Sequence, residues 1–210
     1  MDVNQRSFNR FKERYSAGNV PWDNLDPPPE VVSLSAELVP GLALDLGCGY
    51  GRTAIFLARL GWSAVGVDFI PHAVEVARAR AAAAGVAHLT RFHVASATDL
   101  SFLNDQFDLA IDIGCMHSFT DEQLAAYRDE LVRLLRPGAV YLLFARLITE
   151  PLDDHADGPR GIREGAIHEL FAESFVMKHV EHGSTQVQDQ DPWDSAWFRF
   201  QRLGRQGSTH

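Results

Sequence analysis

Short apolar runs alternate with longer amphipathic segments between residues 42 and 147. The apolar runs, each of strand length, are LALDL (42–46), WSAVGVD (62–68), LTRFHVA (89–95), FDLAIDIG (107–114) and AVYLLFARL (139–147). Strands that are apolar on both faces belong in a sheet covered by helices on both sides. The alternation therefore predicts an α/β fold with a doubly wound, mostly parallel seven-stranded sheet and helices on both faces.

Helices are expected in the amphipathic and alanine-rich segments, over residues 53–61, 71–85, 121–138 and 163–174. Gly61 and Gly85 suit the residue after a helix, and Pro71 suits a first turn. Pro137 and Gly138 would end the third helix. Beyond residue 150 the pattern weakens, and it predicts a loop over 149–161 and further strands over 175–183 and 196–203.

The N-terminal segment carries three rings at helical spacing. Phe8, Phe11 and Tyr15 lie three and four residues apart, on one face of a helix over residues 2–17. That face either docks on the domain or covers a ligand, and we expect an N-terminal helical lid. The prolines of GNVPWDNLDPPPEV (18–31) predict an extended connection after it.

A chain of 210 residues and 23.3 kDa has room for one core. We therefore expect a single domain over 1–210. Its parts would be the N-terminal helices and covering segment (1–40), the central sheet (41–146), and a C-terminal helix and strands (147–210) that complete the sheet.

Charge and composition exclude several classes of function. The net charge of −9 and the absence of a basic run argue against a nucleic-acid partner. The charged N-terminus lacks a signal-peptide core, and no apolar run could span a bilayer. The two cysteines fit a reducing compartment. We expect a cytoplasmic protein without a membrane partner, present as a monomer or homodimer.

A glycine cluster follows the first predicted strand. Gly47, Gly49 and Gly51 let the backbone turn tightly and let a ligand approach main-chain N–H groups. A dinucleotide fingerprint would need glycine at position 52, which is Arg52 and argues against a nicotinamide-dependent oxidoreductase. Asp68 ends the second strand, where a carboxylate can accept bonds from ribose hydroxyls. A ligand with a ribose and an ammonium but no phosphate fits this pattern.

These motifs resemble those of the class I S-adenosylmethionine-dependent methyltransferases. LALDLGCGYG is similar to their first motif, VGVDFIPHAVEVAR to the second strand and its acid, and FDLAIDIGCMHSF to the fourth-strand motif. LVRLLRPGAVYLL resembles the passage into the fifth strand. PWDNLDPPPEV is similar to the cofactor-covering segment of the thiopurine methyltransferase-like, tellurite-resistance-type branch. The resemblance implies S-adenosylmethionine as cofactor.

The resemblance also implies which residues contact that cofactor. The residues expected to bind it are Trp22, Asp45, Gly47, Cys48, Gly49, Gly51, Asp68, Phe69, Ser96, Ala97, Thr98, Ile113 and Gly114. Among them, Asp45 would lie near the amino group and Asp68 at the ribose. Ser96 stands where many relatives have an acid that receives the adenine amine, so that acid contact is either absent or supplied by Asp99.

Methyl transfer from a sulfonium needs alignment, exclusion of water and, for a neutral acceptor, a base. His117 and Tyr15 are the candidate catalytic residues, although a structural role competes for each. The residues expected to line the acceptor pocket are Phe11, Tyr15, Met116, His117, Phe119, Arg146 and Trp193. Cys115 is expected to be buried and inert rather than a nucleophile.

The acceptor is expected to be a small molecule, because few residues remain outside the cofactor fold to choose it. A thiol, a halide, a metalloid oxyanion and a small natural product are all open. No metal is expected, and the acidic run at 153–157 is expected to be a solvated loop. The alternative function is a non-catalytic, S-adenosylmethionine-binding regulatory protein.

Overall fold

The computed structural model describes residues 3–18, 20–24, 26–150, 161–187 and 191–204, with the side chains of residues 3–7 left out. Its strands are β1 (Leu42–Leu46), β2 (Ser63–Asp68), β3 (Thr90–Val94), β4 (Phe107–Ile113), β5 (Leu135–Arg146), β6 (Phe175–Thr185) and β7 (Trp193–Arg202). They form one sheet in the order β3-β2-β1-β4-β5-β7-β6. Only β7 runs antiparallel to its neighbours, so the predicted mostly parallel sheet is confirmed.

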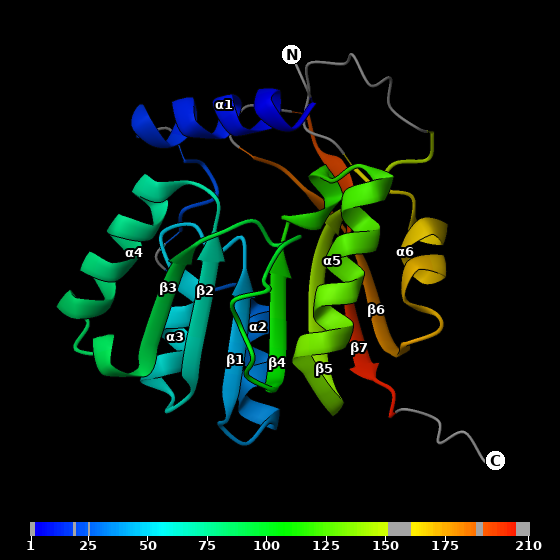
Figure 1. The fold of residues 1–210 in the computed structure, drawn as a ribbon. Helices are drawn as coiled ribbons and strands as arrows, with labels where there is room; N and C mark the ends of the chain where they lie inside the picture. The colour runs from blue at the N-terminus through cyan, green and yellow to red at the C-terminus, as the bar shows by residue number, and fades with distance from the viewer. Residues whose placement is uncertain (1–2, 19, 25, 151–160, 188–190, 205–210) are drawn as a thin grey trace.

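The helices cover both faces of this sheet (Figure 1). They are α1 (Val3–Ser16), α2 (Pro29–Glu37), α3 (Arg52–Arg59), α4 (Pro71–Ala83), α5 (Asp121–Leu134) and α6 (Glu164–Phe171), with short 3₁₀ turns η1 (Ala87–Leu89) and η2 (Met116–Ser118). Helices α2, α3 and α4 pack on one face and α5 and α6 on the other. The doubly wound arrangement puts the carboxyl ends of β1, β2, β4 and β5 at one edge.

Helix α1 lies across that carboxyl edge, apart from the two covering layers (Figure 1). It is held there by Tyr15, which is 5% exposed and packs with Ile70 and Ala73 at the start of α4. Phe8 and Phe11 of the same helix face add to this cluster. The predicted ring-bearing face therefore packs against the edge of the sheet where ligands bind in folds of this kind.

Two boundaries predicted from prolines are wrong. The proline run is not extended to its end, because α2 begins at Pro29, whose fixed φ suits a first helical turn. The helix expected to reach Pro137 ends at Leu134, and β5 begins at Leu135. The residue before Pro137 is pushed towards extended backbone. Phe107 pairs with Leu135 and Leu109 with Val140, so a register shift between these pairs accommodates the extra residues of β5.

Helix α5 begins with a complete capping box. The Thr120 side chain accepts a bond from the backbone N–H of Gln123, and the Gln123 side chain accepts one from the backbone N–H of Thr120. The cap fixes where the chain leaves η2 and enters the helix. Among the described residues, no helix is long and apolar enough to cross a bilayer.

Candidate functional site

The loop after β1 takes a conformation that only glycine accommodates easily. Gly47, Gly49 and Gly51 have φ values of 67°, 52° and 81°. A Cβ on Gly47 would lie 2.8 Å from the Cβ of Cys115, and one on Gly49 would lie 2.9 Å from the Tyr15 hydroxyl. The loop therefore packs closely between the β4 turn on one side and α1 on the other.

Asp68 ties this loop to the end of β2. One carboxylate oxygen accepts a bond from the Gly49 N–H at 2.9 Å, and the other accepts one from the Ile70 N–H at 2.9 Å. Burial raises the pKa of Asp68 despite these two bonds. A carboxylate has about four lone-pair positions, so two remain for hydroxyl groups of a ligand.

Asp45 is a buried carboxyl without an ion-pair partner among the described residues. It is 4% exposed and accepts one bond, from the Ala54 N–H at 3.1 Å. Burial raises its pKa to about 7, outweighing that bond and the positive charge of Arg52. Asp112 and Asp68 raise it further. An ammonium group placed here would offset this cost, so the loop fits a ligand with an amino group and a ribose.

Aromatic side chains from α1 and the segment after it cover the loop. The Tyr15 hydroxyl accepts a bond from the Trp22 indole N–H at 3.3 Å, and its ring meets that of Tyr50 at 5.1 Å. Phe11 meets the ring of Phe69 edge-on at 5.7 Å. The structure thus brings Tyr15, Trp22 and Phe69 together over the glycine loop. Burial raises the pKa of Tyr15, so the phenol stays protonated.

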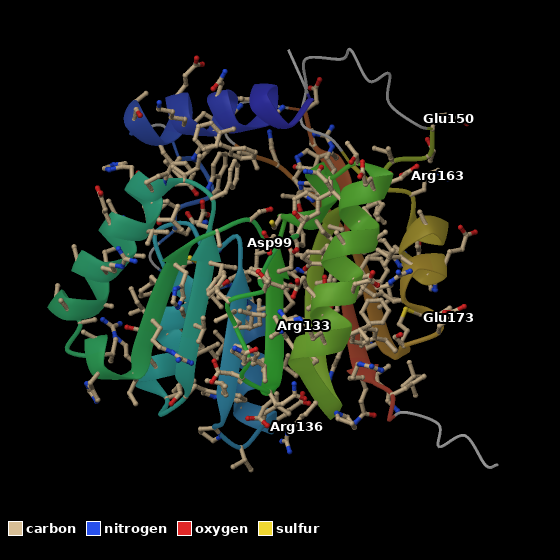
Figure 2. All side chains as sticks on the ribbon, in the orientation of Figure 1. Asp99, Arg133, Arg136, Glu150, Arg163 and Glu173 are labelled. Atoms are coloured by element: carbon tan, nitrogen blue, oxygen red, sulfur yellow. The ribbon has the colours of Figure 1, made fainter. Side chains whose placement is uncertain are left out.

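The turn after β3 satisfies its own polar groups. The Ser96 and Thr98 hydroxyls lie 2.7 Å apart, and the Thr98 N–H donates to Ser96 at 3.2 Å. The Ala97 side chain is buried in the main core. Asp99, labelled in Figure 2, accepts bonds from the N–H and hydroxyl of Ser101. The candidate adenine contacts therefore lie on a short, internally bonded turn.

The turn after β4 brings His117 against the end of β5. Gly114, at φ 87°, donates its N–H to Phe144 O at 3.1 Å, and His117 Nδ1 accepts the Arg146 N–H at 3.0 Å. Burial, with Arg146 and Arg10, lowers the pKa of His117 to about 4. The ring is therefore neutral at pH 7, with its proton on Nε2 and its one lone pair engaged. The half-buried Ile113 packs towards α2 and α3.

Two of the expected acceptor-pocket residues pack against the main core. Met116 is fully buried, and its sulfur accepts a bond from the Tyr141 hydroxyl at 3.5 Å. Its side chain is part of the main core. Phe119 is half-buried and meets the Tyr127 ring at 5.5 Å, against the same core.

The two cysteines are free thiols. The Cys48 side chain packs between α3 and α4, near Gly66, rather than towards the loop mouth. Burial raises the pKa of both Cys48 and Cys115 well above the ordinary value. The expectation that Cys115 is inert agrees with this environment.

A buried hydrogen-bond network lies under the turn after β4, and the sequence did not predict it. Asp112 accepts bonds from the N–H groups of Cys115 at 2.7 Å and Met116 at 3.1 Å, and from the Tyr127 hydroxyl at 2.7 Å. The Tyr127 and Tyr141 hydroxyls lie 3.0 Å apart. Burial raises the pKa of Asp112 to about 6. The signal in the sequence was an acid within the apolar run FDLAIDIG.

A cavity of about 310 Å³ lies away from the glycine loop, between α6 and the ends of β5, β6 and β7. Its lining includes Glu164, His182, Asp194 and Ser195. Among the described residues, no group of His, Cys, Asp or Glu side chains could hold a metal ion. The acidic run at 153–157 lies outside the described residues.

The sheet order, the glycine loop after β1 and the acid at the end of β2 define a class I, Rossmann-like methyltransferase. Residues 43–138 match the family model described as a methyltransferase domain. The chain is 31% identical over 182 residues to the 2-heptyl-1-hydroxyquinolin-4(1H)-one methyltransferase of Mycobacteroides abscessus, covering 85% of this chain and 78% of that one. The chain belongs to the S-adenosylmethionine-dependent methyltransferases.

Solved structures share the whole fold. One, reported for the conversion of a disulfide bond into a thioacetal group during echinomycin biosynthesis, is 30% identical, with a TM-score of 0.74 and coverage of 93% of this chain and 92% of that one. The Burkholderia thailandensis 1,6-didemethyltoxoflavin-N1-methyltransferase, solved with S-adenosylhomocysteine, is 20% identical with a TM-score of 0.74, covering 97% and 92%. The protein uses S-adenosylmethionine as its methyl donor and acts on a small molecule.

Proposed function

We propose that the acceptor is a small hydroxylated heteroaromatic compound. The observation that carries this proposal is the 31% identity, over most of both chains, to a methyltransferase named for a 1-hydroxyquinolin-4-one. Supporting it, Trp193, Trp197 and Phe144 form a group of rings beside His117 and Arg146 at the carboxyl edge, with the Phe144 and Trp197 centroids 4.9 Å apart. Flat rings of this kind suit a planar, partly apolar ligand.

The glycine loop and the two buried acids are the proposed cofactor site. Asp68 would accept the ribose hydroxyls through its two remaining lone-pair positions, and Asp45 would pair with the amino group. The remaining proposed contacts are Trp22, Gly47, Cys48, Gly49, Gly51, Phe69, Ser96, Ala97, Thr98, Ile113 and Gly114. Of these, Cys48 would contribute its backbone, because its side chain packs in the core.

The bound cofactor supplies an activated methyl group on sulfur, so the chain's own residues need only bind, orient and exclude water. The cluster of Phe11, Tyr15, Trp22 and Phe69 lies over the loop and would shield it from water. Because its lone pair is engaged, His117 would donate a bond through Nε2 rather than remove a proton. We therefore assign His117 and Tyr15 to positioning and enclosure.

A sulfur acceptor is the second candidate, favoured by the 30% identity to the structure reported for thioacetal formation. Halides and metalloid oxyanions stay possible acceptors. The likeness to the tellurite-resistance-type branch rests on one segment, PWDNLDPPPEV, which contains Trp22. The non-catalytic alternative gains no support from the relatives, which are named as methyltransferases.

We expect the protein to work without nucleic acid, given its net charge of −9, and as a monomer or homodimer. Light scattering of the purified protein distinguishes the two oligomeric states. These expectations do not depend on which acceptor is methylated.

The deciding experiment is a labelled-methyl assay over hydroxyquinolones, phenols, thiols, amines, halides and metalloid oxyanions. We expect methylation of a hydroxylated heteroaromatic compound at a rate above that of every thiol tested. Asp68→Ala should weaken S-adenosylhomocysteine binding by about 1–3 kcal/mol. Asp129→Ala is its matched control, because Asp129 is an exposed acid on α5 that pairs with the neighbouring Arg128, away from the glycine loop. Intact cofactor binding without any methylated product would support the regulatory alternative.

A further inference from the structure

Arg146 has an unusual environment at the end of β5. Its guanidinium lies 5.2 Å from the centre of the Trp193 ring, and its Nε is buried with no hydrogen-bond partner. No carboxylate among the described residues forms an ion pair with it. A buried charged donor without an acceptor is costly and rare in folded proteins. The side chain as a whole is only half-buried, so an acceptor group on a bound ligand could reach the other nitrogens of the same guanidinium.

A second cation approaches the same place from a different element. Arg10, on α1, lies close enough to act on His117 together with Arg146. His117 itself receives the backbone N–H of Arg146, so its ring has a donor, not an acceptor, left for a ligand. Arg10 of α1 and Arg146 of β5 thus both act on His117 of η2, whose Nε2 carries the ring proton.

The nearby acids face elsewhere. Asp194 follows Trp193 on β7, and successive side chains of a strand point to opposite faces. Glu164 is bonded to His182 at 2.9 Å and approached by His168 at 3.5 Å. The positive charge of Arg146 is therefore not neutralised by these neighbours.

We propose that the acceptor binds as an oxyanion, with its charged oxygen held by Arg146 and its ring against Trp193. This inference rests on the proposed function and narrows its acceptor to a weakly acidic hydroxyl compound. The acceptor hydroxyl gives its proton to water, and the oxyanion forms the new bond to the methyl carbon. The carbon–sulfur bond breaks with its electron pair left on sulfur, and the product is a neutral methyl ether. No general base is needed in this sequence.

The cationic site explains how a hydroxyl could become nucleophilic without an available base. His117 has its lone pair engaged by the Arg146 N–H. Positive charge close to an acidic hydroxyl lowers that hydroxyl's pKa, because the anion is favoured over the neutral form.

The test is a binding titration with 4-nitrophenol, whose yellow phenolate is distinguished from the phenol by absorbance. In the presence of S-adenosylhomocysteine, we expect the protein to bind the phenolate at least about tenfold more tightly than the phenol, which lowers the probe's pKa by about one unit. Arg146→Gln should remove this preference, and Arg146→Lys should restore part of it. Arg163→Gln is the matched control, because Arg163 is exposed at the same edge (Figure 2).

Several outcomes overturn the inference. They are equal affinity for phenol and phenolate, no binding of the probe, and an Arg146→Gln variant that binds like Arg163→Gln. Thermal denaturation and S-adenosylhomocysteine binding report whether each variant is folded. Preferential phenolate binding without methyl transfer to any hydroxyl compound would sink the proposed function and leave the oxyanion site standing. Efficient methylation of a hydroxyquinolone by Arg146→Gln would leave the proposed function standing and overturn the oxyanion site.

Discussion

Tyr127→Phe tests the buried network that supports the β4 turn. The substitution removes only a hydroxyl, which donates to Asp112 at 2.7 Å and lies 3.0 Å from the Tyr141 hydroxyl. Tyr127 is fully buried, so water cannot take the place of the lost donor. Asp112 keeps its bonds from the N–H groups of Cys115 and Met116. The cost should therefore be that of one hydrogen bond to a carboxylate.

A bond to a charged group contributes about 1.5–3 kcal/mol, and for a chain of this length each kcal/mol shifts Tm by about 2–4 °C. We expect Tyr127→Phe to lower Tm by about 3–12 °C at pH 8. The Tyr127 bond lowers the pKa of Asp112, which burial raises to about 6, so the variant has the higher folded-state pKa. Its stability relative to the wild type should fall as pH rises through this range. At pH 5 the carboxyl is neutral in both, and the loss should shrink to about 1 kcal/mol.

Tyr141→Phe is the control, because its hydroxyl contacts only the Tyr127 hydroxyl and the Met116 sulfur. It should cost about 0.5–1.5 kcal/mol with little dependence on pH. Urea denaturation of both variants at pH 5 and pH 8 measures these differences. Equal losses for the two variants, or a pH-independent loss for Tyr127→Phe, would refute the role given to Asp112.

Three further predictions concern the site. Burial raises the folded-state pKa of Asp45 to about 7. Without ligand, the wild type should therefore lose stability relative to Asp45→Asn as pH rises from 4 to 7, by on the order of 4 kcal/mol measured by urea denaturation. A pH-independent difference between the two proteins would contradict this. Gly47→Ala places a Cβ 2.8 Å from the Cβ of Cys115. Its control is Gly85→Ala, where φ is also positive but the new Cβ would have no atom within 4 Å. By thermal denaturation, Gly47→Ala should lose about 1–3 kcal/mol more stability than Gly85→Ala. The pKa of His117 is lowered to about 4, so kcat against pH should show no histidine limb near 6.5; a limb there that disappears in His117→Gln would restore the general base.

Local patterns in the sequence predicted the parts of this protein that short stretches of chain decide. Apolar runs of strand length and the glycines at 47, 49 and 51 identified the sheet and the tight loop after β1, because strand burial and positive φ are set by residue type. The position of Asp68 at the end of β2 followed from the same alternation. Where prolines interrupt, the boundaries were wrong, since pairing of β4 with β5 extended the strand back to Leu135.

The directions of side chains in the turn after β4 depended on contacts distant in sequence. Met116 turns into the core because Tyr141, 25 residues away, offers its hydroxyl there, and His117 is fixed by a backbone group 29 residues away. Asp112 is tied to Tyr127 on the next helix. The sequence by itself determined the methyltransferase fold and the glycine loop that we propose as the cofactor site. Only the tertiary structure decided that Arg146 has no carboxylate partner among the described residues, because pairing of charges depends on which elements the fold brings together.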